Sequence, residues 1–212
     1  FSLSSSWASS AYTENGEKLK TRTYLVDPEV PAEWPDKGID AIEFPLVIPK
    51  ELQHIVDAIN SNNPLSCVKN FSSDDRFTLK LHPFPFGIGE MKASFYGMLT
   101  NLSDPDTSSL YVFKESRAEH ASKLKRSNHE KFLQCHSVSA FFADLFNDEK
   151  PKGYPSIRFA DASLMELTSE RKEETAEIFM IKEELIKAPY EKYNNNAGYV
   201  APCPTITNRT DH

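Results

Sequence analysis

The stretch that decides the fold class is His129–Asn147, with the sequence HEKFLQCHSVSAFFADLFN. Its apolar residues recur three or four positions apart, which predicts one long helix: Phe132, Cys135, Val138, Phe142, Leu145 and Phe146. Shorter segments with strand-like patterns surround it: Phe77–Leu81, Met91–Leu99, Leu110–Lys114, Ile157–Leu167 and Glu177–Leu185. The order of these elements predicts an α+β fold, in which the helix packs on a mostly antiparallel, twisted sheet. A parallel doubly wound sheet would need a helix between each pair of strands.

The first third of the chain is predicted to be irregular. Phe1–Gly16 is rich in serine, and Glu17–Val26 has the composition of a single strand. Prolines then recur through Asp27–Pro49, at a density that disfavours long helices and central strands. We therefore expect an extended, Pro-rich arm that lies over a core. Pro49 suits a helix start, because Leu52, Ile55, Val56 and Ile59 follow at helical spacing.

The connections between the regular segments are polar. Asn101–Ser109, which contains Asp-Pro-Asp, is predicted to be a turn region, and Lys150–Pro155 a loop. Thr168–Thr175 is predicted to be a charged turn between the last two strands. Pro189–His212 is polar throughout.

Composition excludes several classes of protein. The chain has 212 residues and a net charge of -7, which argues against a broad electrostatic contact with nucleic acid. No run of eighteen apolar residues occurs, so a membrane span is not expected. The cysteines, Cys67, Cys135 and Cys203, are far apart and odd in number, so we expect buried or free thiols. Sequons occur at Asn70, Asn101 and Asn208, and since about two are expected by chance they decide nothing.

The segment Phe86-Gly-Ile-Gly-Glu-Met-Lys92 has the composition of a phosphate-binding loop. Gly87 and Gly89 would let backbone N–H groups approach a phosphate, and Lys92 would add a cation at the loop exit. The alternative is an ordinary Gly-x-Gly turn between strands. The segment is neither a Walker A loop nor a dinucleotide fingerprint, because Gly-Lys-Ser/Thr, a third glycine and a following helix are absent.

Three further segments offer candidate functional residues. Lys114 ends the apolar run Leu110–Phe113, and in kinase-like folds a strand lysine reaches the nucleotide phosphates. Its alternative is an edge-strand lysine in solvent. Glu183 and Glu184 follow a predicted strand and would suit a hinge, or simply a solvated strand end. Lys192–Gly198 holds three consecutive asparagines in what is otherwise a polar loop.

The histidines show no ligand spacing and no HExxH frame. A nucleophilic pair of Cys135 and His136 is not expected, because neighbours at i and i+1 on a helix point apart.

Taken in order, these segments resemble the amino-terminal lobe of the alpha-kinase family of atypical Ser/Thr protein kinases. The resemblance runs from about Phe84 to Val200. It implies that Lys92 occupies the position of a phosphate-contacting arginine, that Lys114 is the nucleotide-binding lysine, and that the backbone near Glu183 holds the adenine. Other matching positions are Phe146-Asn147, Ile157-Arg-Phe159, Ile186 and Lys192–Gly198.

The chain also departs from the family pattern. Lys92 keeps the charge of the arginine but loses its bidentate fork. The pair Glu183-Glu184 lacks the usual proline of the hinge. The family's carboxy-terminal lobe, with its Asp-x-Gln-Gly aspartate and its zinc ligands, is missing from the 212 residues. The sequence therefore provides no candidate catalytic residue and no candidate metal ligand.

The resemblance implies residues 76–200 as a nucleotide-binding lobe, residues 1–75 as an extension, and residues 201–212 as a tail or the start of a further lobe. It implies ATP and Mg²⁺ as cofactors, zinc only if the second lobe exists, a protein substrate or partner, and a cytoplasmic location. Phosphoryl transfer is expected only with that lobe. The alternatives are a non-catalytic, pseudokinase-like scaffold module and, on the strength of the sequons, a secreted glycoprotein.

Overall fold

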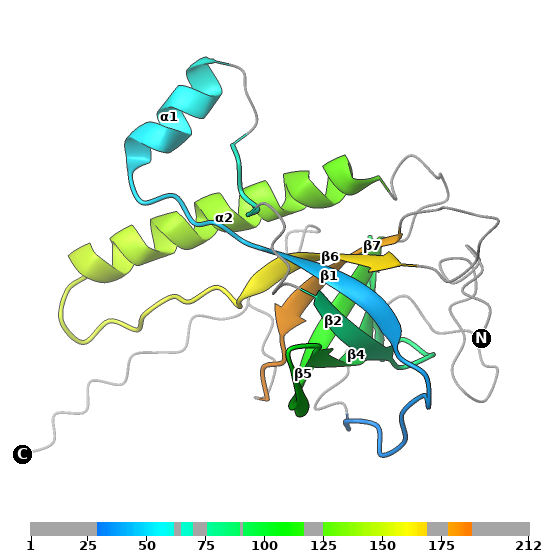
Figure 1. The fold of residues 1–212 in the computed structure, drawn as a ribbon. Coiled ribbons are helices and arrows are strands. Elements are labelled where there is room, and N and C mark those ends of the chain that lie inside the picture. Colours follow the sequence, from blue (N-terminus) through cyan, green and yellow to red (C-terminus); the bar gives the residue numbers. More distant parts are fainter. Residues whose placement is uncertain are drawn as a thin grey trace, which may run out of the picture.

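The strands of this protein form one antiparallel sheet that closes on itself. The structure, a computed structural model, describes residues 29–61, 65–69, 76–89, 91–116, 125–168 and 178–187. In chain order the elements are β1 (Ile39–Pro45), α1 (Leu52–Asn60), β2 (Arg76–Leu81), β3 (Gly87–Ile88), β4 (Lys92–Asn101), β5 (Asp104–Ser116), α2 (Arg126–Glu149), β6 (Ala162–Thr168) and β7 (Ile178–Glu184). The α+β class, the antiparallel pairing and the long helix are confirmed (Figure 1).

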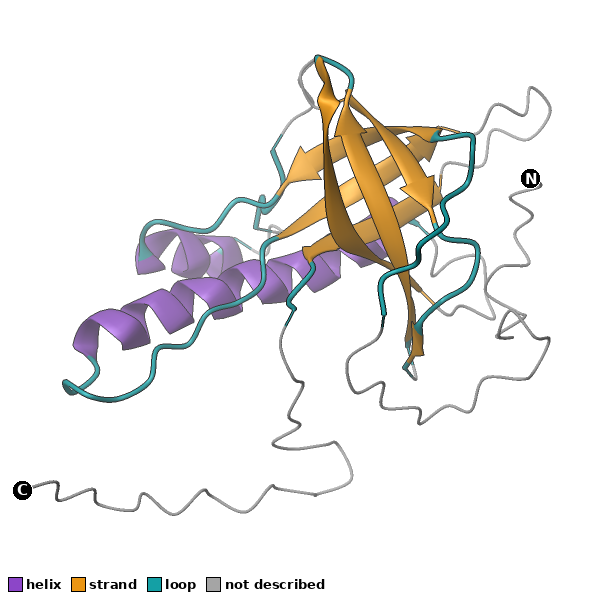
Figure 2. Ribbon diagram, turned by 90° about the horizontal axis from the view of Figure 1, so that it is seen from below, coloured by secondary structure: helices purple, strands orange, loops and turns teal. Residues whose placement is uncertain are grey.

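Closure of the sheet was not predicted. The strand order is β2-β1-β6-β7-β5-β4-β3, and β2 also pairs with β4 through Phe77–Leu81 and Gly97–Asn101. Six strands therefore form a ring, and the short β3 extends one side of it along the first half of β4. Figure 2 shows this barrel with both helices on one side of it.

Alternation along the strands produces two separate cores. One fills the barrel with eleven buried side chains: Ala41, Leu79, Leu81, Ile88, Ala93, Phe95, Leu99, Phe113, Met165, Leu167 and Met180. The other lies between the outer face of the sheet and α2: Phe44, Cys67, Leu133, Ala162, Leu164, Phe179 and Ile181, with Phe132 packed against it. The second core positions α2 over β6 and β7.

The helix over His129–Asn147 is confirmed and is longer than predicted, as α2 spans Arg126–Glu149. The apolar periodicity that reveals it does not mark the face that it buries. The buried residues are His129, Leu133, Ser137, Ala140, Phe141 and Ala143, whereas Phe142, Leu145 and Phe146 are exposed. The packed face mixes large apolar residues with small and polar ones, and α2 comes close to the backbone at Ser137, which donates to the carbonyl of Val47 at 2.6 Å.

The expectation of an extended arm over Asp27–Pro49 is wrong for Ile39–Pro45. This segment is β1, which lies between β2 and β6 and pairs with both. Nine residues without proline, 36–44, are long enough for a strand, and Pro45 stands only at its end. The prolines lie before β1, at its last residue or after it, so they do not prevent the strand from pairing.

The strand bounds also differ from expectation around Asp-Pro-Asp. The predicted turn over Asn101–Ser109 is wrong, since only Leu102 and Ser103 turn and β5 begins at Asp104. The Asn101 side chain closes this tight turn by accepting the Ser103 N–H at 2.8 Å. Pro105 is tolerated because it lies in an irregularity of the β4–β5 ladder, between the pairs Asn101–Asp104 and Thr100–Ser108. The strand predicted over Ile157–Leu167 begins only at Ala162.

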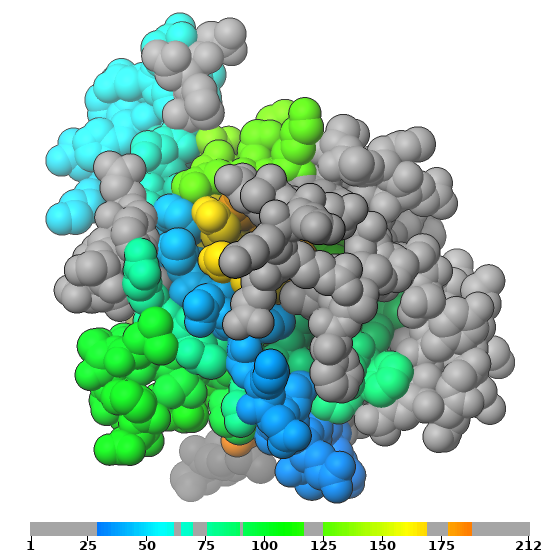
Figure 3. Space-filling model, turned by 45° about the vertical axis from the view of Figure 1, so that its right-hand side comes forward, coloured from blue at the N-terminus to red at the C-terminus, as the bar shows by residue number. Residues whose placement is uncertain are grey.

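The helix after Pro49 is confirmed as α1, which begins at Leu52. Ile55 is its one buried residue, and α1 (cyan) stands out from the body of the molecule in Figure 3. Cys67 is buried and Cys135 is exposed, and both are free thiols as expected. No helix among the described residues is long and apolar enough to cross a membrane.

Several predictions lie outside the described residues. These are the serine-rich start, the strand over Glu17–Val26, the turn after Thr168, the polar end from Pro189 and the asparagine segment Lys192–Gly198.

Candidate functional site

The two-glycine segment forms a β-hairpin. Gly87 pairs with Ser94 across β3 and β4, and the Gly89 N–H donates to the carbonyl of Lys92 at 2.8 Å. The ring of Phe86 stacks on buried Tyr96 of β4, with centroids 4.2 Å apart. The loop is thereby attached to the sheet next to Lys92.

Neither glycine of this hairpin is required by the surrounding structure. A Cβ on Gly87 would meet no atom closer than 3.9 Å, and one on Gly89 no atom closer than 3.5 Å. Neither residue has a positive φ. By contrast, a Cβ on Gly97 in β4 would lie 2.3 Å from the ring of Phe113. A methyl group at either position would therefore make only ordinary van der Waals contacts.

Lys114 and Glu183 form an ion pair across β5 and β7. Lys114 lies opposite Ile181, and Glu183 is two residues further along β7, so both side chains share the face that packs on α2. Exposure of the two side chains is 30% and 13%. Because 69 residues separate them, only the strand register brings this pair together.

Lys92 lies on the same face, beside this ion pair. It is two residues from Ser94, which pairs with Lys114. Its Nζ is buried, lies 3.1 Å from the ring centroid of Phe132 on α2, and has no hydrogen-bond partner among the described residues. Burial lowers the pKa of Lys92 to about 8, the nearby Glu183 carboxylate opposes that shift, and Lys114 adds to it.

His129 contributes a second buried nitrogen to this region. It is 2% exposed, its ring lies against Phe179, and its Nε2 has no partner within the described part of the chain. Burial is the main reason that its pKa falls, and Lys92 adds to the effect. Neither His129 nor Phe132 is a predicted site residue, since the sequence gives Phe132 as part of the apolar spacing of the helix and His129 as a histidine without ligand spacing.

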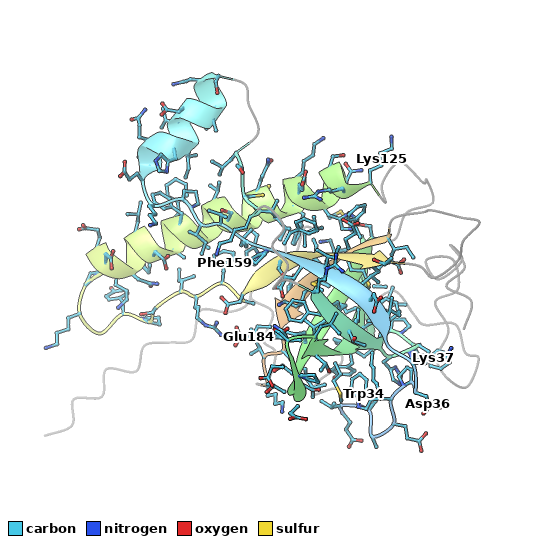
Figure 4. The ribbon with its side chains drawn as sticks, in the orientation of Figure 1. Trp34, Asp36, Lys37, Lys125, Phe159 and Glu184 are labelled. Atoms are coloured by element: carbon cyan, nitrogen blue, oxygen red, sulfur yellow. The ribbon has the colours of Figure 1, made fainter. Side chains whose placement is uncertain are left out.

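The end of β7 is held by the segment before β6, through one backbone hydrogen bond and one ion pair. The Glu184 N–H donates to the carbonyl of Asp161 at 2.9 Å, and Arg158 pairs with the Glu184 carboxylate through both guanidinium nitrogens. Figure 4 shows Glu184 at this end of the strand. Glu183 itself lies within the ladder between β5 and β6, so the first backbone groups beyond the ladder are those of Leu185–Lys187.

The positions Asn147 and Ile157, which entered through the family resemblance, contact each other directly. The Asn147 amide donates to the carbonyl of Ile157 at 2.7 Å and accepts its N–H at 2.9 Å. The contact joins the end of α2 to the segment that precedes β6.

A separate cavity of about 310 Å³ lies where α2 passes one end of the barrel. Its charged groups include Glu43 and Lys182, which pair with each other at 12% exposure each, while the Lys182 ammonium also lies 4.4 Å from the ring of Tyr111. These charges are already compensated. Lys182 and Glu183 are consecutive on β7 and therefore point to opposite faces.

The described residues do not offer a metal site. Within these ranges, no three His, Cys, Asp or Glu side chains gather as metal ligands. His136 is held by the carbonyl of Ala160 at 2.8 Å instead. Lys92 is a buried cation without an acceptor among the described residues, and the side chains around it do not form a ligand set for Mg²⁺ or zinc.

The alpha-kinase family model matches residues 87–211, which is more than half of the chain. The chain belongs to the alpha-kinase family.

Solved structures show the same fold. The alpha-kinase domain of myosin-II heavy chain kinase A in complex with AMP-PNP matches with a TM-score of 0.56 and 16% identity, over 84% of this chain and 70% of that one. The domain of myosin heavy chain kinase A in complex with AMP matches with a TM-score of 0.54 and 15% identity, over 80% and 71%. No curated protein matched the sequence.

Proposed function

We propose that this chain is the ATP-binding lobe of an atypical, alpha-type Ser/Thr protein kinase. The observation that carries the proposal is the gathering of Lys92, Lys114 and Glu183 on one face of the sheet, beside a hairpin whose two glycines the fold does not need. Membership of the family and the nucleotide complexes of the similar structures support it.

Each group has a role that follows from its position. Lys114 and Lys92 bind the phosphates, and Glu183 orients the Lys114 ammonium through their ion pair. Gly87 and Gly89 let the hairpin cover the triphosphate. The backbone of Leu185–Lys187, next to Glu183, provides the donors and acceptors for the adenine.

Transfer of the γ-phosphate to a protein requires more than these residues. Phosphoryl transfer depends on positioning of both substrates and on metal ions that neutralise the developing charge. The family's carboxy-terminal lobe would supply the Mg²⁺ ligands, the catalytic aspartate and the zinc site. Catalysis is therefore proposed only for this lobe joined to that one.

Binding of ATP to the chain tests the proposal. Isothermal titration calorimetry with MgATP should detect binding, and Lys114→Met should weaken it at least about tenfold, the usual loss of one charged hydrogen bond. Lys131→Met is the matched control, because Lys131 is exposed on α2 and the substitution removes the same charge. Equal affinity of the two variants would contradict the assignment of Lys114.

A scaffold function is the second candidate, and exposed apolar residues favour it. Phe142, Leu145 and Phe146 of α2 are 48%, 41% and 43% exposed. If the protein that carries both lobes binds ATP but incorporates no radiolabelled phosphate into any protein, the scaffold reading replaces the kinase.

A cytoplasmic location is part of the proposal, because the free thiols Cys67 and Cys135 suit a reducing compartment. Glycan mass on the protein purified from its source would contradict it.

A further inference from the structure

The environment of the Lys92 ammonium is unusual for a charged group. Its Nζ is buried, and no described residue accepts a hydrogen bond from it. Burying an ammonium without an acceptor is costly, and such groups normally find a partner. Here the face of the Phe132 ring, 3.1 Å away, provides the compensating attraction of a cation–π contact.

The neighbouring charged groups do not provide the acceptor that the Lys92 ammonium lacks. Glu183 of β7 faces Lys92, but its carboxylate is already paired with Lys114 of β5. His129 of α2 faces Lys92 as well, and it is a buried imidazole whose charged form is disfavoured. Within the described part of the chain, none of the charged groups that face Lys92 accepts a hydrogen bond from its ammonium.

This position of Lys92 is incompatible with a phosphate contact. The Nζ lies against the Phe132 ring of α2 and is buried, so it must leave the ring to meet a phosphate at the glycine hairpin. Lys92 is the first residue of β4, directly after the hairpin, and its long side chain can turn outward from there. The Lys92 ammonium therefore has two positions, an inward one on the ring of Phe132 and an outward one toward the phosphates.

We propose that Phe132 is a positioning residue that holds Lys92 in the inward position, and that ATP binding draws the ammonium off the ring. The inference rests on the proposed function as an ATP-binding lobe. Through Phe132, α2 lowers the affinity for ATP without touching the nucleotide, because a contact that stabilises the inward position of Lys92 opposes ATP binding.

The two positions differ in proton affinity, which makes the switch measurable. Inward, the pKa of Lys92 is about 8, so about half of the ammonium is deprotonated at pH 8. Outward, beside phosphates and water, the lysine is fully protonated at this pH. ATP binding at pH 8 should therefore take up about half a proton per chain.

Calorimetric titration of the full chain with MgATP, in two buffers of different ionisation enthalpy at pH 8, tests this directly. We expect Phe132→Leu to abolish the proton uptake and to tighten ATP binding about fivefold, the fold-change that corresponds to about 1 kcal/mol for a desolvated cation–π contact. Phe132→Tyr keeps the ring and should behave as the wild type. Lys92→Met should show no proton uptake.

The outcomes separate the two proposals. Wild-type binding without proton uptake, or weaker binding by Phe132→Leu at pH 8, overturns the inference and leaves ATP binding in place. Absence of any ATP binding by the wild type contradicts the proposed function itself. Phe132→Met is the second variant if Phe132→Leu does not fold, since it fills a similar volume without a ring.

Discussion

Two glycine substitutions distinguish a glycine that the fold requires from one that a ligand requires. Gly97→Ala adds a methyl group 2.3 Å from the ring of Phe113 and 2.9 Å from the side chain of Leu79, and both residues are fully buried. Gly89→Ala adds the same group where the nearest atom is 3.5 Å away, which is an ordinary contact.

The magnitudes follow from these distances. Overpacking of a filled core costs about 1–3 kcal/mol, which for a chain of this size lowers the Tm by roughly 2–12 °C. Gly89→Ala should leave the Tm unchanged or slightly raised, because replacing glycine restricts the unfolded chain. Its effect should fall on ATP, with affinity about tenfold weaker if the methyl group displaces one backbone hydrogen bond to a phosphate.

Thermal unfolding and MgATP titration of both variants provide the measurements. Gly97→Ala should lower the Tm and leave the ATP affinity of the folded protein unaltered. The reasoning fails if Gly89→Ala destabilises the protein as much as Gly97→Ala, or if ATP affinity is unchanged by Gly89→Ala, because Gly89 would then serve the hairpin alone.

Two further predictions concern stability. Burial raises the pKa of Glu115 to about 7, so between pH 4.5 and 7 the folded protein keeps a proton on Glu115 that the unfolded chain releases. The stability of the fold should therefore decrease by up to about 3 kcal/mol as the pH rises from 4.5 to 7. Urea unfolding of Glu115→Gln should lack this loss. Asn147→Ala removes both hydrogen bonds to the backbone of Ile157, and urea unfolding should show a loss of about 1–2 kcal/mol, whereas a loss near zero would mean that water replaces the amide.

Much of the secondary structure could be predicted from local patterns. The helix over His129–Asn147, the strands β2, β4 and β7, and the helix after Pro49 all follow from spacing and from proline placement. The errors arose where one local signal was given too much weight. Proline density argues against β1 and Asp-Pro-Asp predicts a turn, yet Pro45 stands at the end of β1 and Pro105 in an irregularity of the β4–β5 ladder, where a strand tolerates proline.

The candidate site could be predicted only as separate pieces. Gly87, Gly89, Lys92, Lys114 and Glu183 were identified from motifs and from resemblance, and each also had an ordinary structural interpretation. The ion pair of Lys114 with Glu183 has no local signal, because it depends on the register between β5 and β7.

The sequence by itself determined which segments are helix or strand, their order, and the family to which the chain belongs, because these depend on neighbours within about ten residues and on short motifs. Tertiary structure alone decided that β1 completes a closed barrel and which face α2 buries. It also decided that Lys92 meets Phe132, forty positions further along the chain. Such contacts depend on strand register and helix rotation, since a shift of one residue turns a side chain to the opposite face.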